Sequence, residues 1–218
     1  MFNPIIKMKK YFILILTAAA ITASAQSQLL TTNWTGSFRN NGVIPDNDLS
    51  GLTLTENITD WSGSVSNLSV TLNLSGGWNG DIYAYLYYDG VMGVMSVLLN
   101  QVGTPANSGL GYGDSGFNVT LSDSAAYSIH NYQANSPTIT GGVVQGTWQP
   151  DGGGLSVFNG LDASGTWSLY LVDESAGGVM TVNSFGLQAE VTATPEPSTL
   201  ALAGLGGLGM LWQFRRRK

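Results

Sequence analysis

The segment Leu68-Ser69-Val70-Thr71-Leu72-Asn73-Leu74 places an apolar side chain at every second position. Side chains alternate between the two faces of a β-strand, so this pattern predicts a strand with one buried face. The dipeptides Gly76-Gly77 and Asn79-Gly80 follow it and are typical of turns. A second strand is therefore expected at residues 81–88. Further strands are expected at residues 94–99, 116–121, 166–172 and 181–191.

Turn signals separate these strands, notably Asp89-Gly90, Gly152-Gly153-Gly154 and Gly177-Gly178. No amphipathic helical pattern is evident between them. Short strands joined by glycine-rich turns predict an all-β domain built as a sandwich or jelly roll. About 150 residues can bury a substantial core without a metal or a disulfide.

The composition agrees with this fold class. The chain has 218 residues, of which 29 are Gly and only 10% are charged, which disfavours a charged helical bundle or a disordered polyelectrolyte. It has no Cys, which excludes a disulfide framework, a thiol nucleophile and thiolate metal sites. The single histidine, His130, excludes a histidine-rich metal cage.

The formal net charge of −6 is unevenly distributed. Three of the eight basic residues lie within residues 7–10 and four within residues 215–218, so Arg39 is the only basic residue between them. Residues 26–194 contain thirteen acidic residues and one basic residue, a net charge of −12. Because nucleic-acid binding needs a basic surface, the sequence excludes nucleic acid as a partner.

Residues 1–25 have the three parts of a secretory signal peptide. A basic region ends at Lys10, the apolar run 11–16 follows, and Ala23-Ser24-Ala25 fits the A-x-A cleavage pattern. An uncleaved membrane anchor is disfavoured, because the apolar run is short and leads into a cleavage site. We expect an exported protein whose mature chain begins near Gln26.

Residues 193–218 also combine three parts: Pro195-Glu196-Pro197, the apolar stretch 200–214, and the tail Arg215-Arg216-Arg217-Lys218. The apolar stretch predicts a short transmembrane helix, below the ~20 residues of a usual span, and the basic tail would stay on the cytoplasmic side. This arrangement resembles the PEP-CTERM sorting signal of Gram-negative bacteria. An ordinary C-terminal anchor accounts for the helix and the charges but not for the position of the motif.

The PEP-CTERM resemblance implies a partner and a destination. An exosortase, which is an integral membrane enzyme, would recognise the signal and cleave near Pro195-Glu196-Pro197. The protein would then reach the cell surface, the outer envelope or the extracellular matrix. It would contact the membrane only through the C-terminal helix, before processing.

The body of the chain carries a second resemblance, from residue 40 to residue 191. The segments that carry it are Ile44-Pro45-Asp46, Gly80-Asp81-Ile82, Val97-Leu98-Leu99, Gly146-Thr147-Trp148-Gln149-Pro150, 155–160, 165–173 and Phe185-Gly186-Leu187. Together they are similar to the P domain (P/homo B domain) that follows the catalytic domain of kexin- and furin-like subtilases. The family often has a Ser-Pro turn where Tyr87-Tyr88-Asp89-Gly90 stands, and Trp where Phe185 stands.

The P-domain resemblance implies a β-sandwich of jelly-roll type at residues 40–192, preceded by an N-terminal extension at residues 26–39. The residue pattern agrees with this fold. Trp167, Leu169 and Leu171 alternate to one side of an expected strand.

Protease activity is not expected, although P domains accompany Ser-His-Asp proteases. A triad needs a histidine that is oriented by a carboxylate and lies close to a serine nucleophile. His130 stands in Ser128-Ile129-His130-Asn131, which resembles no subtilase histidine motif, and we expect it to be a loop or edge residue. The sequence therefore predicts no catalytic residues and no enzyme.

Calcium is the one cofactor that the sequence suggests, because it binds carboxylate and carbonyl oxygens. The candidate ligands are Asp81, Asp123 and Asp173, and two of them, Asp81 and Asp173, occupy motif positions. The chain has no EF-hand spacing, and aspartates commonly serve turns. Turn or edge roles are therefore favoured, with calcium as the alternative.

Tyr83, Tyr85 and Tyr87 share one face of the expected strand 81–88. If the aliphatic residues between them face the core, these tyrosines line the outside. Together with Trp78 they would form a stacking platform for sugar rings or a surface for a partner. The alternative is a tyrosine row covered by a neighbouring strand or loop.

These observations predict a non-catalytic exported protein with a binding or structural role at the cell surface or in extracellular polysaccharide. The alternative is an accessory P domain that stabilises or targets a separately encoded subtilisin-like serine endopeptidase. In that case the activity resides in the partner.

Overall fold

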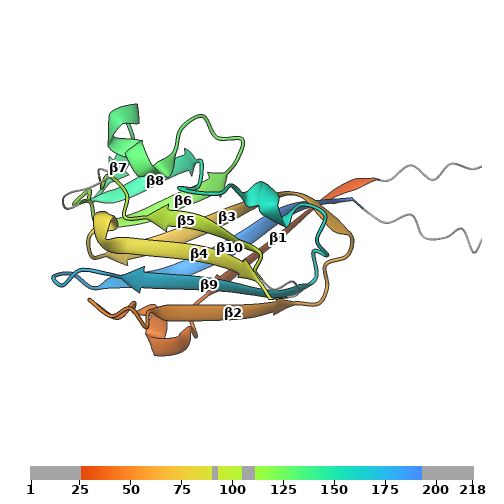
Figure 1. Cartoon of the computed structure of the whole chain (residues 1–218), viewed down its shortest axis with the longest axis horizontal. Coiled ribbons are helices and arrows are strands. Elements are labelled where there is room, and N and C mark those ends of the chain that lie inside the picture. The colour runs from red at the N-terminus through yellow and green to blue at the C-terminus, as the bar shows by residue number, and fades with distance from the viewer. Residues whose placement is uncertain (1–25, 90–92, 105–110, 193–218) are drawn as a thin grey trace, which may run out of the picture. The chain divides into compact units, whose positions relative to one another are not determined.

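The computed structural model describes residues 26–89, 93–104 and 111–192, which form ten strands in two sheets that pack face to face (Figure 1). The larger sheet has the spatial order β1 (Ser27–Thr35), β10 (Met180–Thr192), β3 (Ser64–Gly76), β6 (Gly116–Ser122), β8 (Val143–Trp148) and β7 (Thr138–Thr140). The smaller sheet has the order β2 (Leu52–Ile58), β9 (Gly165–Asp173), β4 (Ile82–Tyr88) and β5 (Met95–Asn100). The predicted all-β sandwich is confirmed.

The helices in the described residues are short 3₁₀ turns: η1 (Arg39–Gly42), η2 (Asn79–Asp81), η3 (Ile129–Asn135) and η4 (Leu155–Phe158). In this part of the chain, no helix has the length and apolar character needed to cross a membrane. The predicted signal peptide and the predicted C-terminal membrane helix lie in residues 1–25 and 193–218, outside the described residues.

All six strands expected from the sequence are present, as β3, β4, β5, β6, β9 and β10. The pattern Leu68–Leu74 lies within β3, where its apolar residues are buried and its polar residues face solvent. Gly76 and Gly77 end this strand with φ of 81° and 61°. A Cβ on Gly76 would lie 2.6 Å from the carbonyl oxygen of Val179, so only glycine fits this turn.

The expected N-terminal extension is corrected by the structure, because residues 26–39 contribute a strand to the sandwich. Strand β1 pairs antiparallel with β10 along its whole length, from Ser27 opposite Thr192 to Thr35 opposite Ser184. Its residue Trp34 packs on Phe185, with ring centroids 4.7 Å apart. The domain therefore begins before residue 40.

The space between the sheets is filled by aromatic and aliphatic side chains. Trp167 of β9 is fully buried, and its ring contacts Tyr88 of β4 and Phe158 of η4 at centroid distances of 4.8 and 5.2 Å. Leu169 and Leu171 are also fully buried, which confirms the inward alternation expected for this strand. The core thus joins β9 to β4 and to η4.

Candidate functional site

The tyrosines of β4 face away from the core. Every second residue from Ile82 to Tyr88 is buried, whereas Tyr83, Tyr85 and Tyr87 between them are partly exposed. The rings of Tyr83 and Tyr85 are parallel to within 3°, with centroids 6.0 Å apart, and Tyr87 follows 6.2 Å from Tyr85. The outward orientation expected from the sequence is present, and the rings form a continuous row.

A fourth tyrosine extends this row to the next strand. Tyr170 of β9 is the direct cross-strand partner of Tyr85, and the two ring centroids are 6.2 Å apart. The Tyr170 hydroxyl donates to the carbonyl oxygen of Leu49 at 2.7 Å, which fixes the ring. Sequence reasoning missed this residue, although the inward alternation on β9 places residue 170 outward. We call Tyr83, Tyr85, Tyr87 and Tyr170 the tyrosine row.

The phenols of Tyr83, Tyr85 and Tyr87 remain neutral over the physiological range, because the pKa of each is raised. Burial raises the pKa of Tyr85, and the neighbouring phenols Tyr83 and Tyr87 add to this effect. Burial likewise raises the pKa of Tyr87. These three tyrosines therefore offer aromatic faces and neutral hydroxyls to a ligand.

Trp78 does not join the tyrosine row, in contrast to the grouping expected from the sequence. It lies in the turn between β3 and β4, directly before η2, and its side chain is 45% exposed. Among the described aromatic rings, none pairs with it. The next residue, Asn79, is buried and accepts from the backbone N–H of Gly116 at 2.7 Å, which anchors this turn to β6.

Two of the candidate calcium ligands, Asp81 and Asp173, lie at one end of the smaller sheet. Asp173 pairs with Ile82 in the β4–β9 register, and the backbone N–H of Glu174 donates to the Asp81 carbonyl at 3.0 Å. Both aspartates are buried, with exposed fractions of 4% for Asp81 and 0% for Asp173. One oxygen of Asp173, Oδ2, has no hydrogen-bond partner.

This burial changes the acidity of both groups. It raises the pKa of the Asp173 carboxyl to about 6, and the negative charges of Asp81 and Asp46 contribute in the same direction. Burial also raises the pKa of Asp81, with a smaller contribution from Asp46. Asp46, which the sequence did not single out, accepts from the backbone N–H of Gly177 at 3.2 Å.

Asp123 lies apart from this acidic pair. It follows the far end of β6, whereas Gly116 at the near end bonds to Asn79, which lies in η2 together with Asp81. Its two oxygens accept from the backbone N–H groups of Leu155 and Ser156 at 2.7 and 2.8 Å. Asp123 therefore holds the start of η4, a turn role that the sequence favoured.

His130 lies in η3 and uses both of its ring nitrogens. Nδ1 is 3.0 Å from Oδ2 of Asp151, and Nε2 is 3.1 Å from the carbonyl oxygen of Thr104. In a Ser-His-Asp triad the second nitrogen faces a serine hydroxyl. Here it faces a backbone carbonyl, and the His–Asp pair ties η3 to the loop that contains Asp151.

Comparison with known proteins identifies one motif. Residues 193–217 match the PEP-CTERM protein-sorting motif. This motif marks proteins that are exported across the inner membrane and anchored to the cell surface or envelope, and it implies processing by an exosortase. The predicted sorting signal, with Pro195-Glu196-Pro197 and the tail Arg215-Arg216-Arg217, lies in this matched segment. The predicted export and surface localisation are confirmed.

Comparison of the whole chain with other proteins does not identify a family. No curated protein matches the chain. Among solved structures, the serine protease of Aeromonas sobria in complex with its chaperone is 17% identical, with a TM-score of 0.44, over 79% of this chain and 28% of that chain. The same protease without the chaperone is 18% identical, with a TM-score of 0.42, over 78% of this chain and 27% of that chain. This chain thus spans less than a third of the length of either.

Proposed function

We propose that this exported protein is a non-catalytic surface module of P-domain type, and that its tyrosine row binds sugar rings of extracellular polysaccharide. The observation that carries the proposal is the tyrosine row itself, four partly exposed rings side by side on two neighbouring strands. Sugar rings stack on aromatic faces through their C–H groups, and their hydroxyls can bond to neutral phenols.

Three further points support a binding role. The sorting motif delivers the protein to the envelope, where polysaccharide is present. The segments between residues 40 and 191 that resemble P domains favour a module without its own active site. The contacts of His130 with Asp151 and with the Thr104 carbonyl occupy the one imidazole that a triad would need.

Replacing Tyr85 and Tyr87 together with alanine is expected to weaken retention on purified matrix polysaccharide by a factor of about 5 to 150. Each aromatic contact contributes about 0.5–1.5 kcal/mol, so two together contribute about 1–3 kcal/mol, and ~1.4 kcal/mol corresponds to a factor of ten. The measurement is a binding isotherm on the immobilised polysaccharide.

The matched control is Tyr127→Ala, which removes a tyrosine that is 54% exposed and outside the tyrosine row. Its binding should equal that of the unaltered protein. Equal binding by the Tyr85/Tyr87 variant would rule out the stacking platform. Cleavage of casein by the purified protein would rule out the non-catalytic assignment, and capture of a subtilase by the tyrosine row would favour an accessory role.

We further propose calcium as a stabilising ligand at Asp81 and Asp173, because the Oδ2 atom of Asp173 is buried without a partner. In residues 26–89, 93–104 and 111–192, no three His, Cys, Asp or Glu side chains form a group suited to a metal. A calcium ion would thus need carbonyl, hydroxyl and water oxygens as additional ligands. With a Kd near 10⁻⁴ M, about 10 mM calcium would raise the free energy of unfolding by about 2.7 kcal/mol.

The calcium proposal is checked by thermal melting with and without calcium. We expect Asp173→Asn to abolish the rise in Tm and Asp123→Asn to retain it, since Asp123 lies apart from the pair. A Tm that does not respond to calcium in the unaltered protein would exclude this ligand.

A further inference from the structure

Much of the outer face of the larger sheet is covered by uncharged polar side chains. Residues directly opposite each other on neighbouring strands share a face, so the strand register defines rungs across the sheet. Three consecutive rungs are Thr35, Ser184, Asn73, Asn118 and Gln145; then Asn33, Gly186, Thr71, Thr120 and Thr147; then Thr31, Gln188, Ser69 and Ser122. We call these residues the polar face. None of these residues is charged, although residues 26–194 carry a net charge of −12. The next rung ends the polar face, because it carries the exposed residues Leu29 and Glu190.

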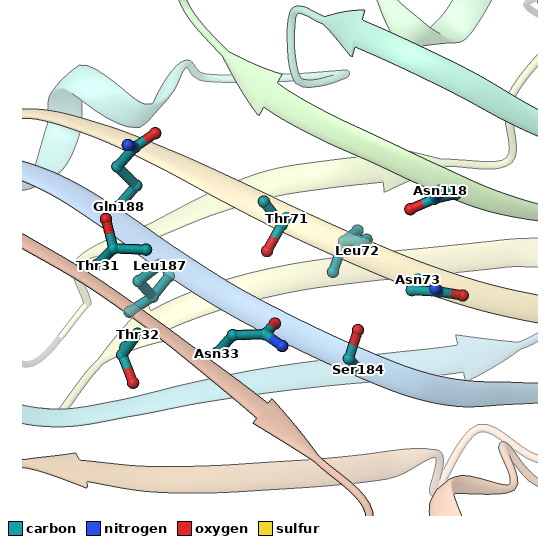
Figure 2. A pocket seen from close by; sticks show the side chains of 10 residues that line it. All are labelled: Thr31, Thr32, Asn33, Thr71, Leu72, Asn73, Asn118, Ser184, Leu187 and Gln188. Atoms are coloured by element: carbon teal, nitrogen blue, oxygen red, sulfur yellow. The ribbon is translucent and has the colours of Figure 1, made fainter.

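A groove of about 330 Å³ lies on the polar face. Figure 2 shows the side chains that line it. Gly186 lies in the middle rung between Asn33 and Thr71. A Cβ at this position would lie 2.6 Å from the carbonyl oxygen of Thr32 and 2.7 Å from Oγ1 of Thr71. The absence of a side chain therefore lets Asn33 and Thr71 lie close over β10 from both sides.

Hydrogen bonds orient several side chains around the groove. Asn118 donates to Oε1 of Gln145 at 2.9 Å, and Asn183 donates to Oδ1 of Asn73 at 2.9 Å. Among the described residues, no hydrogen bond engages the side chains of Asn33 or Thr71. Both are exposed at the groove, so their donors and acceptors are available to a ligand.

The chemistry of the polar face selects the class of ligand. A face without charge has no ionic attraction for a polyanion or a polycation. Amides and hydroxyls both donate and accept hydrogen bonds, and they complement sugar hydroxyls, which do the same. Their row-by-row spacing along strands suits an extended chain rather than a single small molecule.

We propose that the groove lined by Asn33, Thr71 and Gln188 binds a neutral polysaccharide chain. This site shares the ligand class of the proposed function but rests on other residues, because the tyrosine row belongs to the other sheet. The protein would then have two glycan-binding faces, one aromatic and one polar.

The test uses the purified protein in native gels that contain hydroxyethyl cellulose, dextran or galactomannan, with sodium alginate as the charged comparison. We expect retardation by at least one neutral polymer and less by alginate. The double variant Asn33→Ala/Thr71→Val should weaken the apparent affinity about tenfold, and Gln188→Ala should weaken it through a different wall of the groove. Asn159→Ala changes an exposed residue that follows η4 and lies outside both proposed glycan-binding faces, so it is the matched control and should bind normally.

The two glycan proposals fail separately in this experiment. Normal binding by the Asn33/Thr71 variant, with loss in the Tyr85/Tyr87 variant, overturns the groove and leaves the tyrosine row standing. The reverse result supports the groove and overturns the tyrosine row. If no neutral polymer retards the protein, the groove proposal is overturned. It is also overturned if sedimentation velocity shows self-association that the Asn33/Thr71 variant abolishes, because a second copy of the chain would then occupy the groove.

Discussion

Replacing Trp167 with alanine is expected to lower the free energy of unfolding by about 3–5 kcal/mol. The side chain is 0% exposed and contacts rings on β4 and η4, so its removal leaves a cavity between the sheets. Its indole N–H also donates to the carbonyl oxygen of Ala163 at 3.3 Å, and that buried acceptor would lose its partner. Urea unfolding followed by circular dichroism measures the change.

Trp78→Ala is the matched control, because Trp78 is 45% exposed and pairs with no described aromatic ring. It should change the free energy of unfolding by less than about 1 kcal/mol, as surface substitutions usually do. A loss below about 1.5 kcal/mol for Trp167→Ala would mean that the two sheets close over the cavity, contrary to the tight packing of protein cores.

The strands that the sequence predicted are those with a clear local pattern. Strand β3 alternates strictly from Leu68 to Leu74, and β4 alternates tyrosines with aliphatic residues. Strand β2 was not predicted, although its sequence also alternates and Leu52, Leu54 and Ile58 are buried. Local hydrophobic periodicity was therefore sufficient for the central strands.

Two other strands that the sequence did not predict, β1 and β8, lack such a pattern. In β1, Leu29 is 58% exposed and the adjacent Leu30 packs against the core, so hydrophobicity does not alternate with burial. The strand is held by pairing with β10, whose partner residues lie 149 to 165 positions later in the chain. Strand β8 is interrupted by Gly146, whose φ of 111° is unusual for a strand. Long-range pairing of this kind is not visible in a local pattern.

The candidate sites also differ in whether a local sequence pattern or only the strand register brings their residues together. The outward tyrosines of β4 follow from alternation alone, whereas Tyr170 joins them only through the β4–β9 register. Register also brings Asp173 beside Ile82, and therefore close to Asp81. Asp46 approaches Asp173 from a loop, so no strand pattern predicts this contact. The polar face depends on the register of five strands and therefore emerges only in the folded chain.

The stability of the protein is expected to fall as pH rises from about 4 to about 6, because of Asp173. Burial raises the pKa of this carboxyl from 3.8 to about 6, so the folded state holds a proton that the unfolded state has already released. A group with a raised pKa in the folded state stabilises the fold below its unfolded pKa, and this contribution is lost as pH rises through its folded pKa. The loss is about 3 kcal/mol, since one pKa unit corresponds to about 1.4 kcal/mol.

Asp173→Asn isolates this effect, because asparagine keeps an oxygen for the backbone N–H of Ser175 and cannot ionise. In a chelating buffer at pH 4, 5, 6 and 7.5, the unaltered protein should lose stability relative to this variant, and the difference should level off above pH 6. Glu174→Gln removes an exposed neighbouring carboxyl and should follow the unaltered protein. Burial also raises the pKa of Asp81 and of Asp151, so the stability of Asp173→Asn should still depend weakly on pH.

Parallel stability curves for the unaltered protein and Asp173→Asn would show that solvent reaches Oδ2 of Asp173 in solution. This buried carboxylate without a partner would then no longer argue for a bound cation.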